Sequence, residues 1–574
     1  MEQQFEGVAR NDLFLRFTRQ KSVQWEALPS PAKFFKPLVH HKFQYGNIYV
    51  QGVLVDPFGN ALSEQALVDL VVQHGDKAVE HIEGDFVMAV DDSRYGVWCA
   101  TDPSATLPLY YKLTSNELLI SSRAENLSVR SANDLSLPGI IAALSSGYPW
   151  GELTLLKDWK ALRPGHVVKI DTSNNASVSC YFDPETDESI EGFRNAQELI
   201  DAVDKGLKSI ASRYKRLLIP LSGGVDSRLI AVRCYALGIP FEAITFVANV
   251  PDGDDFDVAS RLVKVFGVKH HRWEWNPSVE NCIENFIKLC IASGGGNDAY
   301  TSYPDGMSIF GKVASGFDCA LRGDHVFGYG EFAESVYRSA IALSINYWDN
   351  MDWVLNPAYQ SKVNMESVFE EQEGIRIDAP GPEANAWRHI SYRKSRSPRF
   401  LLPVGQLQSQ YALMAYPFLT KEIVARLSRT EPGLRDGKLI AKQALEVCSP
   451  PEISRIPLSN QPTWKNTEPL LNLPSEVTSE MIKIVRQPNV LSEIVDDSAV
   501  INAYSGFLSG QSHGKGHRSL LSSLKEIVKK TLPKSMIAAY QDATQHGFKT
   551  PPQFVFKRYF AMKVFLNSIS ENVK

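Results

Sequence analysis

One short run of glycine, serine and aspartate carries the clearest chemistry in this sequence: Ser222-Gly223-Gly224-Val225-Asp226-Ser227. Its two glycines let a phosphate approach the backbone closely, and its two serine hydroxyls can donate hydrogen bonds. A carboxylate such as Asp226 beside a phosphate needs a cation between them, most simply Mg²⁺. The run therefore predicts a site for a phosphate-bearing ligand together with a divalent metal.

The residues on either side of this run predict how it is held. Leu217 to Leu221 is apolar and indicates a buried parallel strand, and the apolar-periodic stretch from Leu229 to Leu237 indicates a helix. A strand, a glycine turn and a helix in this order aim backbone N–H groups and a helix N-terminus at an anion. The run contains no lysine, so it differs from the phosphate loop of kinases and GTPases.

A second predicted strand end adds another carboxylate. The stretch from Asp318 to Tyr329 predicts a buried strand that ends in a turn at Gly323 and Asp324, where α/β sheets collect their ligands. Asp226 and Asp324 could then share octahedral metals with phosphate oxygens. The competing interpretation is that Asp324 caps the helix that follows it.

These motifs resemble those of a known family. Ser222 to Ser227 is similar to the Ser-Gly-Gly-x-Asp-Ser pyrophosphate loop of ATP pyrophosphatases, which split ATP between its α and β phosphates and adenylate a substrate. Gly323 and Asp324 resemble the second pyrophosphate-side motif of asparagine synthetase-like proteins. The resemblance implies ATP and Mg²⁺ as cofactors, with Asp226 and Asp324 as the metal ligands. The implied ATP-binding residues are Leu221, Ser222, Gly223, Gly224, Asp226, Ser227, Val247 and Gly323.

The motifs that would handle the acceptor differ from the family's pattern. Leu321 stands where asparagine synthetases have a Glu three residues before the Asp, and His325 replaces the Glu after it. No Lys follows Pro450 to Ile453 at the place of the family's catalytic Lys. Arg455 is the nearest cation; it could hold charge on an adenylate but could not act as a base, because its pKa is too high. The expected catalytic residues are Asp324, Arg455 and, as a reserve candidate, Lys549.

The first part of the chain predicts mostly short strands and resembles the amidotransferase domain of the same family. The resemblance is carried by Glu83 to Phe86, Asp102, Pro108 to Tyr111, and Ser121 to Glu125. It implies a sandwich of two sheets between helices.

Two features of the family's glutaminase are missing from this part. Its nucleophile is a Cys directly after the initiator Met, whose freed amine serves as the base. This chain has Glu2 there, and its first cysteine is Cys99. Gln51-Gly52-Val53 replaces the Asn-Gly-Glu run of the family's glutamine pocket. We therefore expect a retained scaffold that does not hydrolyse glutamine.

The expected fold is α/β: an N-terminal two-sheet sandwich flanked by helices, then a doubly wound parallel sheet of the ATP-pyrophosphatase type with helical additions. At 574 residues the chain is too long for one ordinary core. We expect a degenerate amidotransferase-like domain over residues 1–185 and a synthetase domain over residues 196–574. The polar, acidic stretch from Asp183 to Asn195 is the expected linker.

Composition narrows the expected partners and compartment. The net charge of −5 gives no reason to expect nucleic acid or an anionic membrane as a partner, and no apolar run is long enough to span a bilayer. The first residues are acidic and polar, unlike a signal peptide. Seven scattered cysteines without a C-x-x-C pair indicate reduced thiols and a cytoplasmic location.

The resemblance implies an ATP-dependent, AMP-forming ligase that adenylates a substrate carboxylate and couples it to an amine or ammonia, without its own glutaminase. Two alternatives stay open. Relatives that cyclise their own substrate, the β-lactam synthetases and lasso-peptide cyclases, also lack the N-terminal Cys. A protein of another class would use the scaffold only to bind nucleotide or partners, without catalysis. The expected partners are a small-molecule or peptide carboxylate and an amine donor, and a homodimer stays open.

Overall fold

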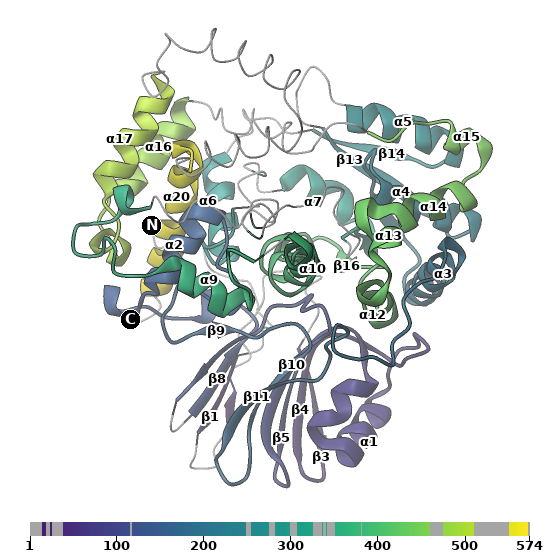
Figure 1. The fold of residues 1–574 in the computed structure, drawn as a ribbon, viewed down its shortest axis with the longest axis horizontal. Coiled ribbons are helices and arrows are strands. Elements are labelled where there is room, and N and C mark those ends of the chain that lie inside the picture. Colours follow the sequence, from purple (N-terminus) through teal and green to yellow (C-terminus); the bar gives the residue numbers. More distant parts are fainter. Residues whose placement is uncertain are drawn as a thin grey trace.

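Two antiparallel sheets lie face to face in the N-terminal part of the chain, at the bottom of Figure 1. Their strand orders are β2-β1-β8-β7-β9 and β11-β10-β6-β5-β4-β3. The strands of the first sheet are, in that order, Val23–Trp25, Phe14–Thr18, Glu117–Ser121, Tyr110–Leu113 and Lys160–Ala161. Those of the second are Ala176–Cys180, His166–Ile170, Gly96–Thr101, Glu83–Asp92, Gly46–Val55 and Leu38–Phe43.

Side chains alternate between the two faces of these strands. On β4, Tyr49 faces the core between the two sheets, whereas Ile48 and Val50 face a second core that includes Leu67 of α1 (Glu64–His74). The second sheet is thus buried on both faces, by the first sheet and by a helix. The expected two-sheet sandwich with helices on its outside is confirmed.

A five-stranded parallel sheet forms the centre of the C-terminal part, in the order β14-β13-β12-β15-β16. Its strands are, in that order, His270–Glu274, Phe241–Val247, Leu217–Pro220, Cys319–Leu321 and Leu413–Ala415. Ile219 of β12 faces a core shared with α3 (Ala196–Arg213) and α4 (Val225–Ala236), and Leu218 faces the opposite core, shared with α7 (Ser308–Ala314). Helices on both faces confirm the doubly wound sheet.

The direction in which strands are added reverses at β12. β13 and β14 follow on one side of β12, and β15 and β16 lie on the other. The carboxyl ends of β12 and β15 therefore flank a topological switch point, which is where sheets of this kind bind ligands.

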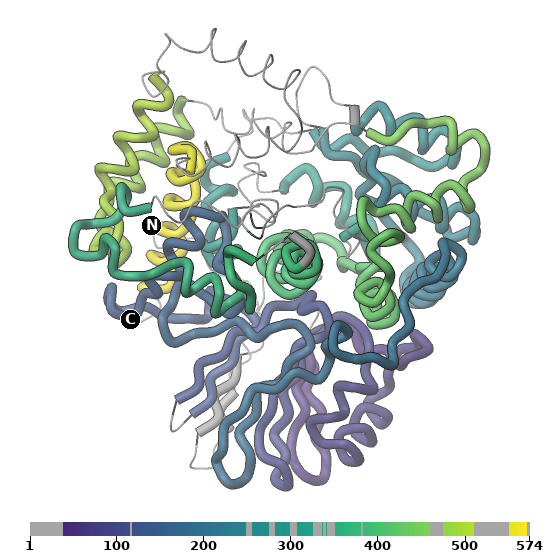
Figure 2. Tube along the Cα trace, in the orientation of Figure 1, coloured from purple at the N-terminus to yellow at the C-terminus, as the bar shows by residue number. Residues whose placement is uncertain are grey.

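A helical cluster joins the two parts of the chain, at the left of Figures 1 and 2. Five of its helices bury side chains in one core: α2 (Leu137–Ser146), α6 (Cys282–Ala292), α16 (Ser475–Val485), α17 (Asp497–Leu508) and α20 (Pro552–Glu571). In this core Phe560 of α20 stacks on Phe286 of α6, and Phe556 stacks on Tyr504 of α17. The helical additions expected from the sequence are therefore packed around the last helix.

The computed structural model describes residues 14–18, 23–25, 38–114, 117–247, 254–274, 282–298, 303, 307–324, 336, 340, 351–379, 381–459, 475–509 and 550–571. Within these residues, no helix is both long and apolar enough to cross a membrane.

The predicted linker is held by ion pairs: Asp183 pairs with Arg393 and Lys394 of a π-helix (Tyr392–Leu401).

Candidate active site

The glycine and serine run predicted to bind phosphate is a tight loop between β12 and α4. The Leu221 N–H donates to the Ile244 carbonyl (2.9 Å) and the Leu221 carbonyl accepts from the Thr245 hydroxyl (2.7 Å), which fixes the start of the loop against β13. The Ser222 N–H donates to Ser227 Oγ at 2.9 Å, and the two serine hydroxyl oxygens are 2.9 Å apart. The loop therefore closes onto the first turn of α4, whose N-terminus carries partial positive charge.

Gly223 lies where a larger residue would not fit. A Cβ at this position would come within 2.5 Å of Ser459 Cβ and 3.0 Å of Asp255 Oδ1. The Gly223 N–H donates to Asp255 Oδ1 at 3.1 Å, and its carbonyl accepts from the Ser459 N–H at 3.0 Å. The close approach of the Ser459 and Asp255 side chains leaves no room for a Cβ at this position, which favours glycine.

Arg228 of α4 ties this loop to the segment after α15 (Pro451–Ser454). Its buried guanidinium donates to the carbonyls of Ile456 (2.7 Å) and Pro457 (2.8 Å) and to that of Gly223 (3.1 Å). Burial lowers the pKa of Arg228 to about 10, so it stays charged near neutral pH. Arg455, the expected adenylate cation, is exposed at the end of α15, and within the described residues its side chain makes no hydrogen bond to the loop.

A lysine from a distant helix reaches the loop. Lys438 Nζ donates to Asp226 Oδ2 at 2.6 Å. Lys438 directly precedes α14 (Leu439–Cys448), and both it and Gly437 adopt left-handed backbone angles, with φ of 59° and 67°. Sequence reasoning did not assign Lys438 to the site. The Gly437-Lys438 pair is compatible with a tight turn, but it does not indicate the contact with Asp226.

The end of β15 packs directly against the start of α4. A Cβ at Gly323 would lie 3.0 Å from the Ser227 nitrogen and 3.4 Å from Asp226 Cβ. The next residue, Asp324, is held by Arg322, whose Nε and Nη2 donate to the two carboxylate oxygens at 2.5 and 3.2 Å. Burial alone would lower the pKa of Arg322, but the ion pair with Asp324 raises it above its ordinary value.

Each of the two predicted metal-binding carboxylates thus faces a protein cation. Both stay partly exposed, with side-chain exposures of 17% for Asp226 and 12% for Asp324, and a carboxylate oxygen can accept more than one partner. In the described part of the chain no group of three or more His, Cys, Asp or Glu side chains could hold a metal. Two carboxylates and two serine hydroxyls beside a glycine-lined loop nevertheless fit ATP with Mg²⁺, provided that phosphate oxygens complete the metal's ligands.

The remaining predicted site residues are more scattered. Val247 is buried at the end of β13, paired with Glu274 of β14, and the loop that follows it lies outside the described residues. His325 and Lys549 also lie outside the described residues. Leu321, in place of the family's Glu, is fully buried in β15.

Two residues of the amidotransferase-like motifs, one altered and one retained, have structural positions in the sandwich. Gln51 is buried on β4, opposite Val87. Asp102 accepts hydrogen bonds from the N–H groups of Phe86 (3.2 Å), Ser104 (2.8 Å) and Thr106 (2.9 Å), so it organises the turn after β6.

Comparison with known proteins identifies two sequence families along the chain. A family described as glutamine amidotransferase domain matches residues 61–182, and a family described as asparagine synthase matches residues 197–524. No curated protein matches the chain.

Several solved structures are similar to it at low identity. The allosteric regulatory enzyme of purine biosynthesis is 8% identical over 48% of this chain and 77% of that chain, with a TM-score of 0.20. Glutamine phosphoribosylpyrophosphate amidotransferase from B. subtilis, complexed with ADP and GMP, is 10% identical over 41% and 60%, with a TM-score of 0.18. NMN synthetase from Francisella tularensis is 15% identical over 37% and 94%, with a TM-score of 0.20.

Proposed function

This chain belongs to the asparagine synthase family, whose model matches more than half of it, and we propose that it is an ATP-dependent, AMP-forming amide-bond synthetase. In the proposed reaction, a substrate carboxylate oxygen attacks the α-phosphate of ATP, the bond to the β-phosphate breaks, and pyrophosphate leaves. An amine or ammonia then attacks the acyl carbon, and AMP leaves as the amide forms.

The observation that carries the proposal is the contact between Gly323 and the first turn of α4. Gly323 lies so close to the Ser227 nitrogen that even a methyl group would crowd it. Because Asp324 follows Gly323 and Asp226 precedes Ser227, this contact supports a site in which both carboxylates lie beside the loop from Ser222 to Ser227. A chain that did not handle nucleotide would have no need for this arrangement.

The chain's own residues supply positioning and charge. The hydroxyls of Ser222 and Ser227 and the N-terminus of α4 would bind the phosphates that leave as pyrophosphate. Asp226 and Asp324 would hold Mg²⁺, which neutralises charge on the leaving group when it is bound. Lys438, 2.6 Å from Asp226, adds a second positive charge at the same place. Fixed charges of this kind act where negative charge develops in the transition state.

The proposed enzyme has no glutaminase of its own, since Glu2 stands where the nucleophilic Cys is expected. The amine would therefore arrive as free ammonia or as an amine on the substrate. An amine on the carboxylate substrate itself would make the enzyme a cyclase, with the same adenylation step.

Product analysis tests the proposal. The purified protein is incubated with ATP, Mg²⁺ and ammonium, together with a panel of carboxylic acids or cell extract, and the nucleotides are separated. AMP should form in an acid-dependent way. Lys438→Met should lower AMP formation by about 100-fold, while Lys442→Met, which replaces an exposed lysine in the first turns of α14, should not change it. Acid-dependent ADP in place of AMP would overturn the proposal, and ATP binding without turnover would favour the non-catalytic alternative.

A further inference from the structure

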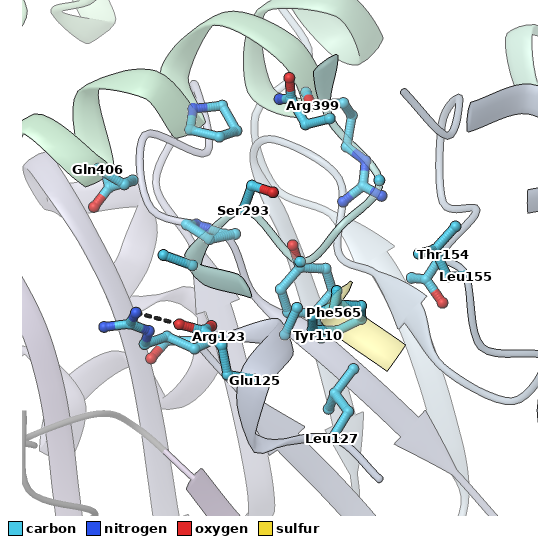
Figure 3. Close-up of a pocket in the computed structure, with 18 of the residues that line it drawn as sticks. Tyr110, Arg123, Glu125, Leu127, Thr154, Leu155, Ser293, Arg399, Gln406 and Phe565 are labelled. Carbon is cyan, nitrogen blue, oxygen red and sulfur yellow. Dashed lines mark hydrogen bonds and ion pairs between the residues drawn. The ribbon is translucent and has the colours of Figure 1, made fainter. Parts of the chain in front are cut away.

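A cavity of about 100 Å³ lies between the N-terminal sandwich and the C-terminal part (Figure 3). Its lining includes Tyr110 and Arg123 from the sandwich, Arg399 from the π-helix, Gln406 from α11 (Leu402–Gln408) and Phe565 from α20. No residue of the phosphate loop lines it. A water molecule needs roughly 10–15 Å³ of such space, so the cavity has room for several waters or one small organic molecule.

Arg399 brings to this cavity a positive charge that no described carboxylate neutralises. Its Nε and Nη2 donate to the backbone carbonyls of Pro149 (3.4 Å) and Leu153 (2.5 Å), and its guanidinium carbon lies 5.8 Å from the centre of the Tyr110 ring. Burial lowers the pKa of Arg399, and the Tyr110 hydroxyl opposes that effect; no carboxylate is among the opposing groups. Carbonyl oxygens hold the guanidinium in place, but they do not cancel its charge.

Two neighbouring arginines are neutralised, in contrast to Arg399. Arg123 pairs with Glu125 on the sandwich side of the cavity, as the dashed line in Figure 3 marks. Arg393, earlier in the same π-helix, pairs with Asp183 and Glu185. A buried charge without a counter-ion is costly. A ligand with one negative charge would therefore be stabilised beside Arg399.

A second unmet need lies at Gln51. This side chain is only 4% exposed and lines the same cavity. Among the described residues no donor reaches its Oε1, although buried polar atoms are nearly always hydrogen-bonded. A ligand that satisfied both groups would carry one negative charge and an O–H or N–H donor.

We propose that this cavity binds a small hydroxy acid with a single carboxylate, at a site separate from the phosphate loop. The carboxylate pairs with Arg399, the hydroxyl donates to Gln51 Oε1, and the rings of Tyr110 and Phe565 pack against the carbon chain. An amino acid would pair its carboxylate with Arg399 but add an ammonium group, so one positive charge in the cavity would stay uncompensated. A dicarboxylate would bring a second negative charge that Glu125 repels. The inference does not depend on the proposed ATP chemistry.

Three isosteric probes separate the two predicted contacts. Lactate has the charge and the hydroxyl, propionate lacks the hydroxyl, and lactamide lacks the charge. Binding to the full-length protein is measured by titration with saturation-transfer NMR. Lactate should bind with a millimolar or lower Kd, propionate about tenfold more weakly, and lactamide not measurably, because a hydrogen bond to a charged group is worth about 1.5–3 kcal/mol.

Variants assign each contact to its residue. Arg399→Gln should weaken lactate binding by about tenfold or more, whereas Arg396→Gln, in the same π-helix but outside the cavity lining, should not change it. Gln51→Leu, on the sandwich side, should lower lactate affinity to that of propionate and leave propionate affinity unchanged. This second variant keeps the test valid if Arg399→Gln does not fold.

Four results would overturn the inference. Three of them are an affinity for lactamide equal to that for lactate, equal lactate affinity in wild type and Gln51→Leu, and no lactate binding at tens of millimolar. Preference for the amino acid alanine over lactate would also contradict it, because the zwitterion leaves the positive charge unmatched.

Discussion

Lys438 Nζ lies 2.6 Å from Asp226 Oδ2, although the two residues are 212 positions apart in the chain. The predicted phosphate-binding loop, Ser222 to Ser227, contains no lysine, yet Lys438 in the turn before α14 reaches it. A second long-range contact, of Gly323 with Ser227, adds Asp324 and its partner Arg322 to the same place. The candidate site therefore has two carboxylates, each beside a cation, around one helix N-terminus.

Loss of the Lys438 charge is expected to lower turnover by about 100-fold without preventing folding. The Lys438 and Asp226 side chains are 29% and 17% exposed, so Lys438→Met should change the free energy of unfolding by no more than about 1 kcal/mol. Lys438→Arg, which keeps the charge, should retain part of the activity. Urea denaturation measured beside AMP formation checks both expectations. A Lys438→Met protein with near-full activity would exclude this lysine from the site.

Neutralising Asp324 is expected to cost both activity and stability. Asp324→Asn removes a predicted metal ligand and leaves the largely buried Arg322 without its counter-ion, which should destabilise the protein by about 1–3 kcal/mol. Asp226→Asn should also abolish AMP formation, but with a smaller loss of stability, because Lys438 is the more exposed cation.

The double variant Arg322→Met/Asp324→Asn separates the two effects of Asp324. It should recover stability, since no unpaired charge remains, and it should stay inactive. Denaturant unfolding of the wild type, the single variants Arg322→Met and Asp324→Asn, and the double variant gives the coupling energy between Arg322 and Asp324. If Asp324→Asn keeps near-full activity with a true substrate, the two-carboxylate metal site is wrong.

The parts of the fold that depend on local pattern could be predicted from the sequence. The loop from Ser222 to Ser227 was predictable because strand, turn and helix are adjacent in the chain and each follows from its own residues. The sandwich was predictable from motifs such as Pro108 to Tyr111, whose strand β7 takes part in the first sheet. The site roles of these residues stay predictions.

The parts that depend on distant contacts could not be predicted. Nothing in the residues around Lys438 says that its side chain reaches Asp226, because this contact is set by how α14 packs against α4. The geometry of the ion pair between Arg322 and Asp324 likewise depends on distant residues. Arg322 packs close to Gly405 and donates a hydrogen bond to Gln408 Oε1. The cavity at Arg399 combines elements from both ends of the chain, so no single stretch of sequence carries its signal.

The purified protein is expected to have no glutaminase activity. Glu2 occupies the place of the nucleophile, and Gln51 and Val53 replace residues of the glutamine pocket. Incubation with glutamine should release no more glutamate than a buffer blank, with or without ATP. Glutamate release above that blank, absent after heat denaturation, would contradict the expectation.

Stability is expected to rise with pH above neutrality because of Lys557. This lysine of α20 is 2% exposed, and burial lowers its pKa from 10.5 to about 7 although Asp298 opposes the shift. Between these values the unfolded chain binds a proton that the folded chain does not, so stability rises with pH; below pH 7 both states are protonated and the penalty is complete.

The variant Lys557→Met has no titratable amine at this position. It should be more stable than wild type at pH 7, and its advantage should shrink by up to about 1.4 kcal/mol per pH unit as the pH rises towards 8.5. Urea unfolding of both proteins at several pH values measures the difference. A constant difference across this range would mean that Lys557 is charged in the folded protein.

Isotope exchange between labelled pyrophosphate and ATP tests the central claim most directly, because it reports adenylation before any amine takes part. The protein is given ATP, Mg²⁺, labelled pyrophosphate and an acid that supports AMP formation, without ammonium or amine, and label in ATP is counted. The account predicts acid-dependent exchange that Asp226→Asn abolishes, Lys438→Met lowers by about 100-fold, and Lys442→Met leaves intact. Acid-dependent ADP and phosphate, with no label in ATP, would contradict it.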